Sequence, residues 1–103
     1  MKKSIDILEK VSDELNRHTV FYKFNKNIEA SDKYKKGRID ASTWLNELVY
    51  YYIKKEKNFI IEFKEEINKQ KNKINSVKNG DYKMGLIDEL KTIEDSIDDR
   101  NNK

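Results

Sequence analysis

The side chains that most often carry catalysis are scarce in this sequence. His18 is the only histidine and the chain has no cysteine, which leaves no Cys/His pair, no thiolate metal site and no disulfide framework. Neither a G-x-S-x-G turn nor a glycine-rich phosphate loop occurs. Glu62, Glu65 and Glu66 stand among lysines and lack the Glu-x-x-His pattern of di-metal helix bundles. We therefore predict that the chain is not an enzyme and has no catalytic, cofactor or metal site, and no small-molecule substrate is evident.

The stretch from Arg17 to Arg38 suggests a different chemistry. It holds seven Lys or Arg residues against two acids, whereas the part from Asp81 onward holds seven acids against four bases. Lysines neutralise phosphates and aromatic rings stack on bases. One interpretation is a nucleic-acid surface made of Lys23, Lys26, Lys33, Lys35, Lys36 and Arg38. The alternative is a solvated helix face in a lysine-rich chain.

The middle of the chain must position any such surface, and it is strongly helical. Residues 41 to 77 contain neither Gly nor Pro, and their apolar residues form one helical stripe. The stripe is broad up to Phe63 and then narrows, which is typical of a coiled-coil contact. Because Ser31 or Asp32 can cap it, one helix is predicted from about residue 33 to about 78, with a length of about 70 Å.

Two shorter helices are predicted beside this one. Gly80 and Asp81 form a stop and a restart, and the apolar residues that follow repeat at helical spacing, as they also do near the N-terminus. The fold is therefore predicted to be all-α and elongated, with three helices at about residues 4–28, 33–78 and 82–98. The very long central helix forms hairpins with the N-terminal and the C-terminal helix. Residues 1–98 make a single helical domain, and 99–103 a flexible polar tail.

The segment from 18 to 26 leaves an alternative open. Thr19, Val20, Phe21 and Tyr22 are good strand formers as well as possible helix residues. If "TVFYKFN" were a strand, the chain would resemble a ribbon-helix-helix DNA-binding protein, with "GRIDASTWLNELVYYYIKKE" as its second helix. "KNIEASDKYKK" would then have to be the first helix, for which it is short and poorly amphipathic.

A short motif occurs twice, as "YKKGRID" from Tyr34 and as "YKMGLID" from Tyr82. It uses two of the three glycines in the chain, and each copy follows a predicted helix cap. A glycine inside a helix costs about 1 kcal/mol relative to alanine, so we interpret the motif as a device for close helix packing in which the missing side chain lets another backbone approach. Duplication and coincidence both remain possible origins.

Several large side chains project away from the predicted core. On a helical wheel, Tyr50 and Ile61 lie nearly opposite the stripe, and Trp44 and Tyr51 lie at its shoulder. Aromatic residues of this kind are favoured at protein interfaces, although scattered exposed apolar residues are also normal. These four residues are the predicted partner interface.

These patterns favour binding over catalysis. We expect a cytoplasmic helical interaction or adaptor protein that self-associates, as a homodimer or larger homo-oligomer, and modulates a larger complex; the alternative is a small nucleic-acid-binding protein. The longest apolar run, "LVYYYI", is too short to cross a membrane, and the mixed charges of the long helix do not favour membrane-surface binding.

Overall fold

Helices make up almost all of the structure, a computed structural model that describes residues 2–25, 27–54 and 60–101. In order, they are α1 (Lys2–Phe24), α2 (Asp32–Lys54), α3 (Ile60–Ile74) and α4 (Asp81–Asn101). No strand occurs in these described ranges, so the predicted all-α class is confirmed. The strand alternative and the resemblance to ribbon-helix-helix proteins are wrong, because α1 continues through Thr19–Tyr22. At the other end, α4 extends into the predicted polar tail.

The predicted central helix is wrong, because two helices, α2 and α3, occupy its place. A continuous helix would separate positions 52 and 63 by about 16 Å along its axis. Instead, the ring centroids of Tyr52 and Phe63 lie 6.0 Å apart, in an edge-to-face contact. The apolar stripe of α3 therefore packs against that of α2 instead of continuing it, and residues 55–59 lie outside the described residues.

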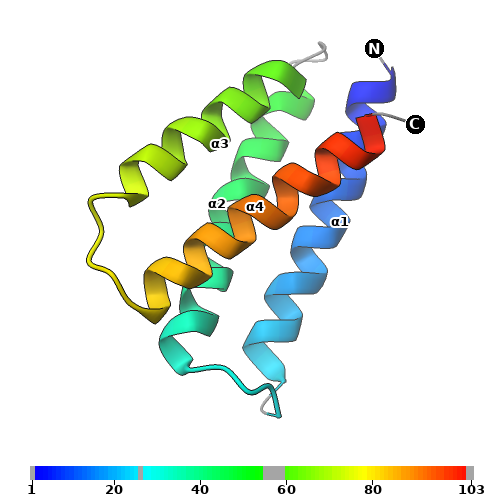
Figure 1. The fold of residues 1–103 in the computed structure, drawn as a ribbon. Coiled ribbons are helices and arrows are strands. Elements are labelled where there is room, and N and C mark those ends of the chain that lie inside the picture. Colours follow the sequence, from blue (N-terminus) through cyan, green and yellow to red (C-terminus); the bar gives the residue numbers. More distant parts are fainter. Residues whose placement is uncertain (1, 26, 55–59, 102–103) are drawn as a thin grey trace.

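The packing of α3 against α2 also makes the predicted elongated shape wrong. The principal extents of the molecule are 40 × 29 × 23 Å, far short of a helix of about 70 Å. In Figure 1, α1 and α2 run side by side, α3 diverges from α2, and α4 crosses α2 and continues towards the start of α1. α4 packs most extensively against α2, and α3 packs only lightly against both α2 and α4.

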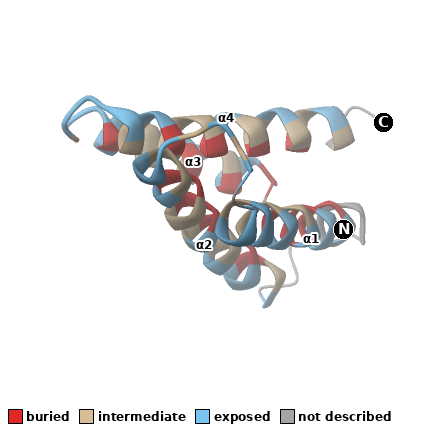
Figure 2. Cartoon of the chain, turned by 90° about the horizontal axis from the view of Figure 1, so that it is seen from below, coloured by how far each residue is buried: buried red, intermediate tan, exposed pale blue. Residues whose placement is uncertain are grey.

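The core follows the predicted apolar stripes. Figure 2 shows the buried positions turned inward on each helix and the exposed ones outward. Phe63 of α3 and Ile93 of α4 are both fully buried. The largest fully buried apolar side chains come from all four helices: Leu8, Val11, Leu15, Leu45, Val49, Phe63, Ile67, Leu90, Ile93 and Ile97. The N-terminus of α2 is capped as predicted, since the backbone N–H of Tyr34 donates to Ser31 Oγ at 3.1 Å.

The two copies of the repeated motif meet where α2 crosses α4. A methyl group added at Gly37 would lie 2.2 Å from the carbonyl oxygen of Tyr82 and 3.1 Å from the Cα of Gly85. One added at Gly85 would lie 2.2 Å from the carbonyl oxygen of Tyr34. The two backbones are therefore in direct contact, which confirms that the glycines serve close packing and shows that the partner of each motif is the other copy.

Side-chain hydrogen bonds repeat this reciprocal arrangement. The Tyr34 hydroxyl donates to Asp88 Oδ2 at 2.7 Å, and the Tyr82 hydroxyl donates to Asp40 Oδ2 at 2.6 Å. The tyrosine that opens each motif is thus bonded to the aspartate that closes the other. The crossing has an approximate two-fold relation, with the glycines at its centre and one Tyr–Asp pair on either side.

Alanine at the crossing should destabilise the protein, although alanine normally stabilises a helix relative to glycine by about 1 kcal/mol. Here the added methyl group meets backbone atoms that cannot move alone, so we expect Gly37→Ala and Gly85→Ala each to lower the free energy of unfolding by about 1–3 kcal/mol. Urea unfolding followed by circular dichroism measures this. Variants as stable as the parent, or more so, would contradict the close crossing.

Candidate functional site

The four predicted interface residues do not form one surface. Tyr50, Tyr51 and Ile61 are exposed where α2 ends and α3 begins, at the same end of the molecule. We call these three exposed residues the ring surface; Tyr50 and Ile61 each lie about 200° around their helix from the Tyr52–Phe63 contact, so both side chains turn away from that contact. Trp44 lies earlier in α2 than Tyr50. It is half-buried against the core and lines a pocket between α2, α3 and α4. The helical wheel placed Trp44 at the shoulder of the stripe but could not show that α3 folds back over that shoulder.

The predicted nucleic-acid residues are also divided. Lys23, Lys33 and Lys36 are exposed and Lys35 is half-buried, all near the end of α1 and the start of α2, whereas Lys26 lies outside the described residues. Arg38 is buried and does not lie with them. Its Nε donates to Glu89 Oε1 at 2.8 Å, and its guanidinium lies 4.9 Å from the centre of the Tyr22 ring.

A further apolar surface on α1 was not anticipated. Val20, Phe21 and Phe24 are 57%, 46% and 70% exposed, and with Arg17 they occupy one outward face of the helix at i, i+3, i+4 and i+7 spacing. We call these three residues the α1 stripe. Continuing the core through Phe21 and Phe24 would require a phase shift in the helix. Instead α1 remains regular, so Tyr22 turns inward and its neighbours turn out.

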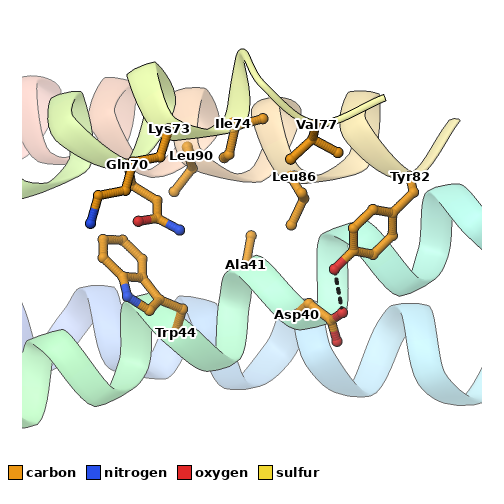
Figure 3. A pocket seen from close by; sticks show the side chains of 10 residues that line it. All are labelled: Asp40, Ala41, Trp44, Gln70, Lys73, Ile74, Val77, Tyr82, Leu86 and Leu90. Carbon is orange, nitrogen blue, oxygen red and sulfur yellow. Dashed lines mark hydrogen bonds between the residues drawn. The ribbon is translucent and has the colours of Figure 1, made fainter. Parts of the chain in front are cut away.

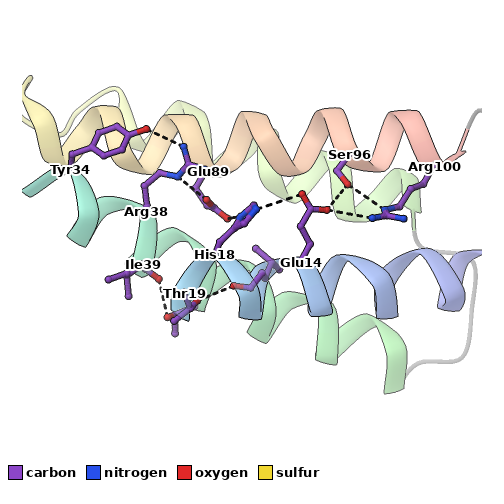
Figure 4. A network of polar contacts seen from close by, with 11 residues as sticks. Glu14, His18, Thr19, Tyr34, Arg38, Ile39, Glu89, Ser96 and Arg100 are labelled. Atoms are coloured by element: carbon purple, nitrogen blue, oxygen red, sulfur yellow. Dashed lines mark hydrogen bonds and ion pairs between the residues drawn. The ribbon is translucent and has the colours of Figure 1, made fainter. Parts of the chain in front are cut away.

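A polar network joins α1 to α2 and α4 (Figure 4). Its centre is Glu89, which is fully buried. One of its carboxylate oxygens accepts from Arg38, and the other lies 2.7 Å from His18 Nδ1, which must carry a proton to donate there. The network continues along α1 and α4, where Ser96 Oγ donates to Glu14 Oε1 at 2.7 Å and Arg100 lies 3.6 Å from the same oxygen.

The contacts in this network give His18, the only histidine of the chain, a structural role. His18 lies between Glu89 and Glu14 and connects helices that are far apart in the sequence. A buried carboxylate is costly unless it is paired and hydrogen-bonded, and Arg38 and His18 provide that pairing. We therefore assign His18, Arg38 and Glu89 a structural role, in docking α1 onto the crossing of α2 and α4.

Trp44 lines a pocket between α2, α3 and α4 (Figure 3). Its volume is about 290 Å³, and we call it the Trp44 pocket. The apolar lining comes from Ala41, Trp44, Ile74, Val77, Leu86 and Leu90. Gln70 and Lys73 of α3 lie at the Trp44 end, and the hydrogen-bonded pair Asp40 and Tyr82 lies at the other end. Such an arrangement can hold a small apolar group with a polar end.

The Asp40–Tyr82 pair gives one end of the pocket a distinct electrostatic character. Hydrogen bonding to the Asp40 carboxylate, together with partial burial and repulsion from the same charge, raises the pKa of Tyr82 to about 12. Asp40 also accepts from Lys36 Nζ at 2.9 Å. Both partners at this end are therefore already engaged within the protein.

Comparisons with known proteins find no relative of this chain: no family model matches it, and neither curated proteins nor solved structures show significant similarity. Across the described helices, none is both long and apolar enough to cross a membrane. Within the same residues, no three His, Asp or Glu side chains are grouped so that they could hold a metal ion. The predicted absence of metal, cofactor and catalysis remains a prediction.

Tyr82→Phe should change how stability depends on alkaline pH. Because the pKa of Tyr82 is raised in the folded protein above its unfolded value of about 10, its contribution is fully present below pH 10 and is lost as the pH rises towards 12. The variant should be less stable at neutral pH by about 1 kcal/mol. Its deficit should then shrink in alkali, as urea unfolding at several pH values can measure.

Asp40→Asn is the matched control for this experiment, since it removes the acceptor charge and leaves the phenol in place. It should flatten the alkaline profile as Tyr82→Phe does. A difference between parent and Tyr82→Phe that stays constant with pH would show that the hydrogen bond does not form in solution.

Proposed function

We propose that this chain is a non-enzymatic helical protein that acts by binding other proteins, and that it binds a second copy of itself through the ring surface. The observation that supports the proposal is the exposure of Tyr50, Tyr51 and Ile61, which are 50%, 53% and 74% exposed. Burial of large aromatic and branched side chains is a major source of affinity in interfaces. The cytoplasmic location and a role in a larger complex remain predictions from the sequence.

The charges around the ring surface suit a two-fold contact. Glu47 and Lys54 are both exposed, one turn before and one turn after Tyr50 on α2. In an antiparallel two-fold arrangement of α2 against its copy, Glu47 of one copy faces Lys54 of the other, and the reverse. Opposite charges then meet on both sides of the paired rings, which favours this register over a parallel one.

The α1 stripe is less suited to self-association. Arg17 lies in line with Phe21 and Phe24, and the exposed Lys23 lies next to them. Two copies that met at this face would bring basic side chains together, which opposes association. This difference in charge is the reason for choosing the ring surface.

Nucleic-acid binding is the second candidate function. The observation that favours it is the grouping of lysines around two neighbouring surface hollows. Lys23 and Lys35 line one surface hollow, and Lys33, Lys36 and Lys78 line another beside it on α2. The exposed phenylalanines of the α1 stripe lie next to Lys23, so cations that contact phosphates and rings that stack on bases come together.

Self-association can be tested by sedimentation velocity over a wide range of protein concentration. We expect the parent to form a dimer and Tyr50→Ser/Ile61→Ser to be monomeric or much weaker. If the double substitution removes about 2 kcal/mol of binding free energy in total, the scale of one hot-spot side chain, the dissociation constant should rise about thirtyfold. Circular dichroism should show an intact fold, because both side chains point away from the core.

Val20→Ser/Phe24→Ser is the matched control, with two exposed apolar residues changed at the opposite end of the molecule. It should dimerise like the parent. A monomeric parent, or a dimer lost only in the control, would refute the proposed interface. If the parent is monomeric and binds DNA or RNA with steep salt dependence, and Lys33→Glu/Lys35→Glu/Lys36→Glu loses that binding, the second function takes its place.

A further inference from the structure

The Trp44 pocket exists because the two faces of the α2–α4 crossing carry different residues. Arg38 follows Gly37 as Leu86 follows Gly85, and Ala41 follows Asp40 as Glu89 follows Asp88. On one face of the crossing the residues are Arg38 and Glu89, which form an ion pair that His18 of α1 completes. On the related face they are Leu86 and Ala41, which are apolar and line the pocket.

The helix that covers each face differs as well. α1 packs extensively against α2 beside the first face, whereas α3 packs only lightly against α2 beside the second face. The pocket there is lined by apolar side chains and by the indole of Trp44. Water in contact with such walls is unfavourable, so displacing it with an apolar group is a source of binding free energy.

The polar groups at the ends of the pocket define the charge of a ligand. Asp40 and Tyr82 are bonded to each other at 2.6 Å, so that end offers a carboxylate that is already satisfied and would repel an anion. Lys73 and Gln70 lie at the other end, beside Trp44. Among the described residues, neither the Lys73 ammonium nor the Gln70 amide has a hydrogen-bond or ion-pair partner.

We infer that the Trp44 pocket binds a small amphipathic anion, with its apolar body between Ala41, Leu86 and Trp44 and its carboxylate or similar head at Lys73 and Gln70. The volume of about 290 Å³ fits a short apolar chain or a single ring, and it is too small for a nucleotide cofactor. The same chemistry is offered by a free carboxylic acid and by the apolar C-terminal residue of a peptide. This site is separate from the ring surface, so it does not depend on self-association.

The only tryptophan of the chain is Trp44, so its fluorescence reports on this pocket alone. Octanoate and octyltrimethylammonium, which share a tail and differ in charge, are the matched probes. We expect octanoate to change the fluorescence saturably and with one site, and to bind more tightly than the cation. Lys73→Glu should weaken the binding of octanoate by about threefold to tenfold and strengthen the binding of the cation, because it reverses the charge at the Lys73 end of the pocket.

Leu86→Phe, which fills the pocket, should remove the saturable response. Lys73→Glu carries little folding risk, since the residue is exposed, and it keeps the test decisive if Leu86→Phe misfolds. The inference fails if neither probe saturates, if the two probes bind alike and Lys73→Glu changes neither, or if the response appears only with loss of helical circular dichroism.

Two peptides then separate the possible sources of the ligand. A short peptide that ends in leucine is compared with the same peptide amidated at its C-terminus. Tighter binding of the free-acid peptide than of octanoate assigns the pocket to protein C-termini, whereas tighter binding of octanoate assigns it to free carboxylic acids. Equal binding of the acid and amide peptides, together with no preference for octanoate over the cation, would overturn the assignment of an anionic head.

Discussion

Direct contact between two helix backbones, at Gly37 on α2 and Gly85 on α4, is the constraint on which the rest of the structure depends. A methyl group at either position would overlap a carbonyl oxygen of the other helix at 2.2 Å. Tyr34 with Asp88, and Tyr82 with Asp40, hold the crossing on its two sides. Because no side chain separates the helices here, their distance is set by backbone atoms, which deform much less than side chains.

Both of the features that we relate to function and stability follow from this crossing. On one face, close approach brings Arg38 and Glu89 together deep in the molecule, where His18 can complete the network. On the related face the same approach brings together Ala41 and Leu86, whose apolar side chains leave the Trp44 pocket. A two-fold arrangement of nearly equal segments thus gives one polar and one apolar site, according to which residue follows each glycine and each aspartate.

Local patterns in the sequence predict the helices, the Ser31 cap, most of the core and the close packing at the glycines. They do not predict that α2 and α3 are separate helices, because the helical pattern continues without Gly or Pro and the packing of α3 against α2 and α4 is a tertiary effect. Nor does periodicity show that Arg38 meets a buried acceptor in a distant helix. For the same reason the sequence does not show that Trp44 lies in a pocket. The pocket is formed partly by α3, and a helical wheel of one helix gives no information on where another helix packs.

Nuclear Overhauser spectroscopy on protein isotopically labelled only at glycine tests the crossing most directly. The chain has three glycines, so the spectrum is simple. The structure predicts a strong cross-peak between the α-protons of Gly37 and Gly85, because a Cβ at either position would lie 3.1 Å from the Cα of the other. Gly80 is the internal control, since nothing lies within 4 Å of its Cβ position. Well-resolved α-proton signals with no cross-peak between Gly37 and Gly85 would contradict the account.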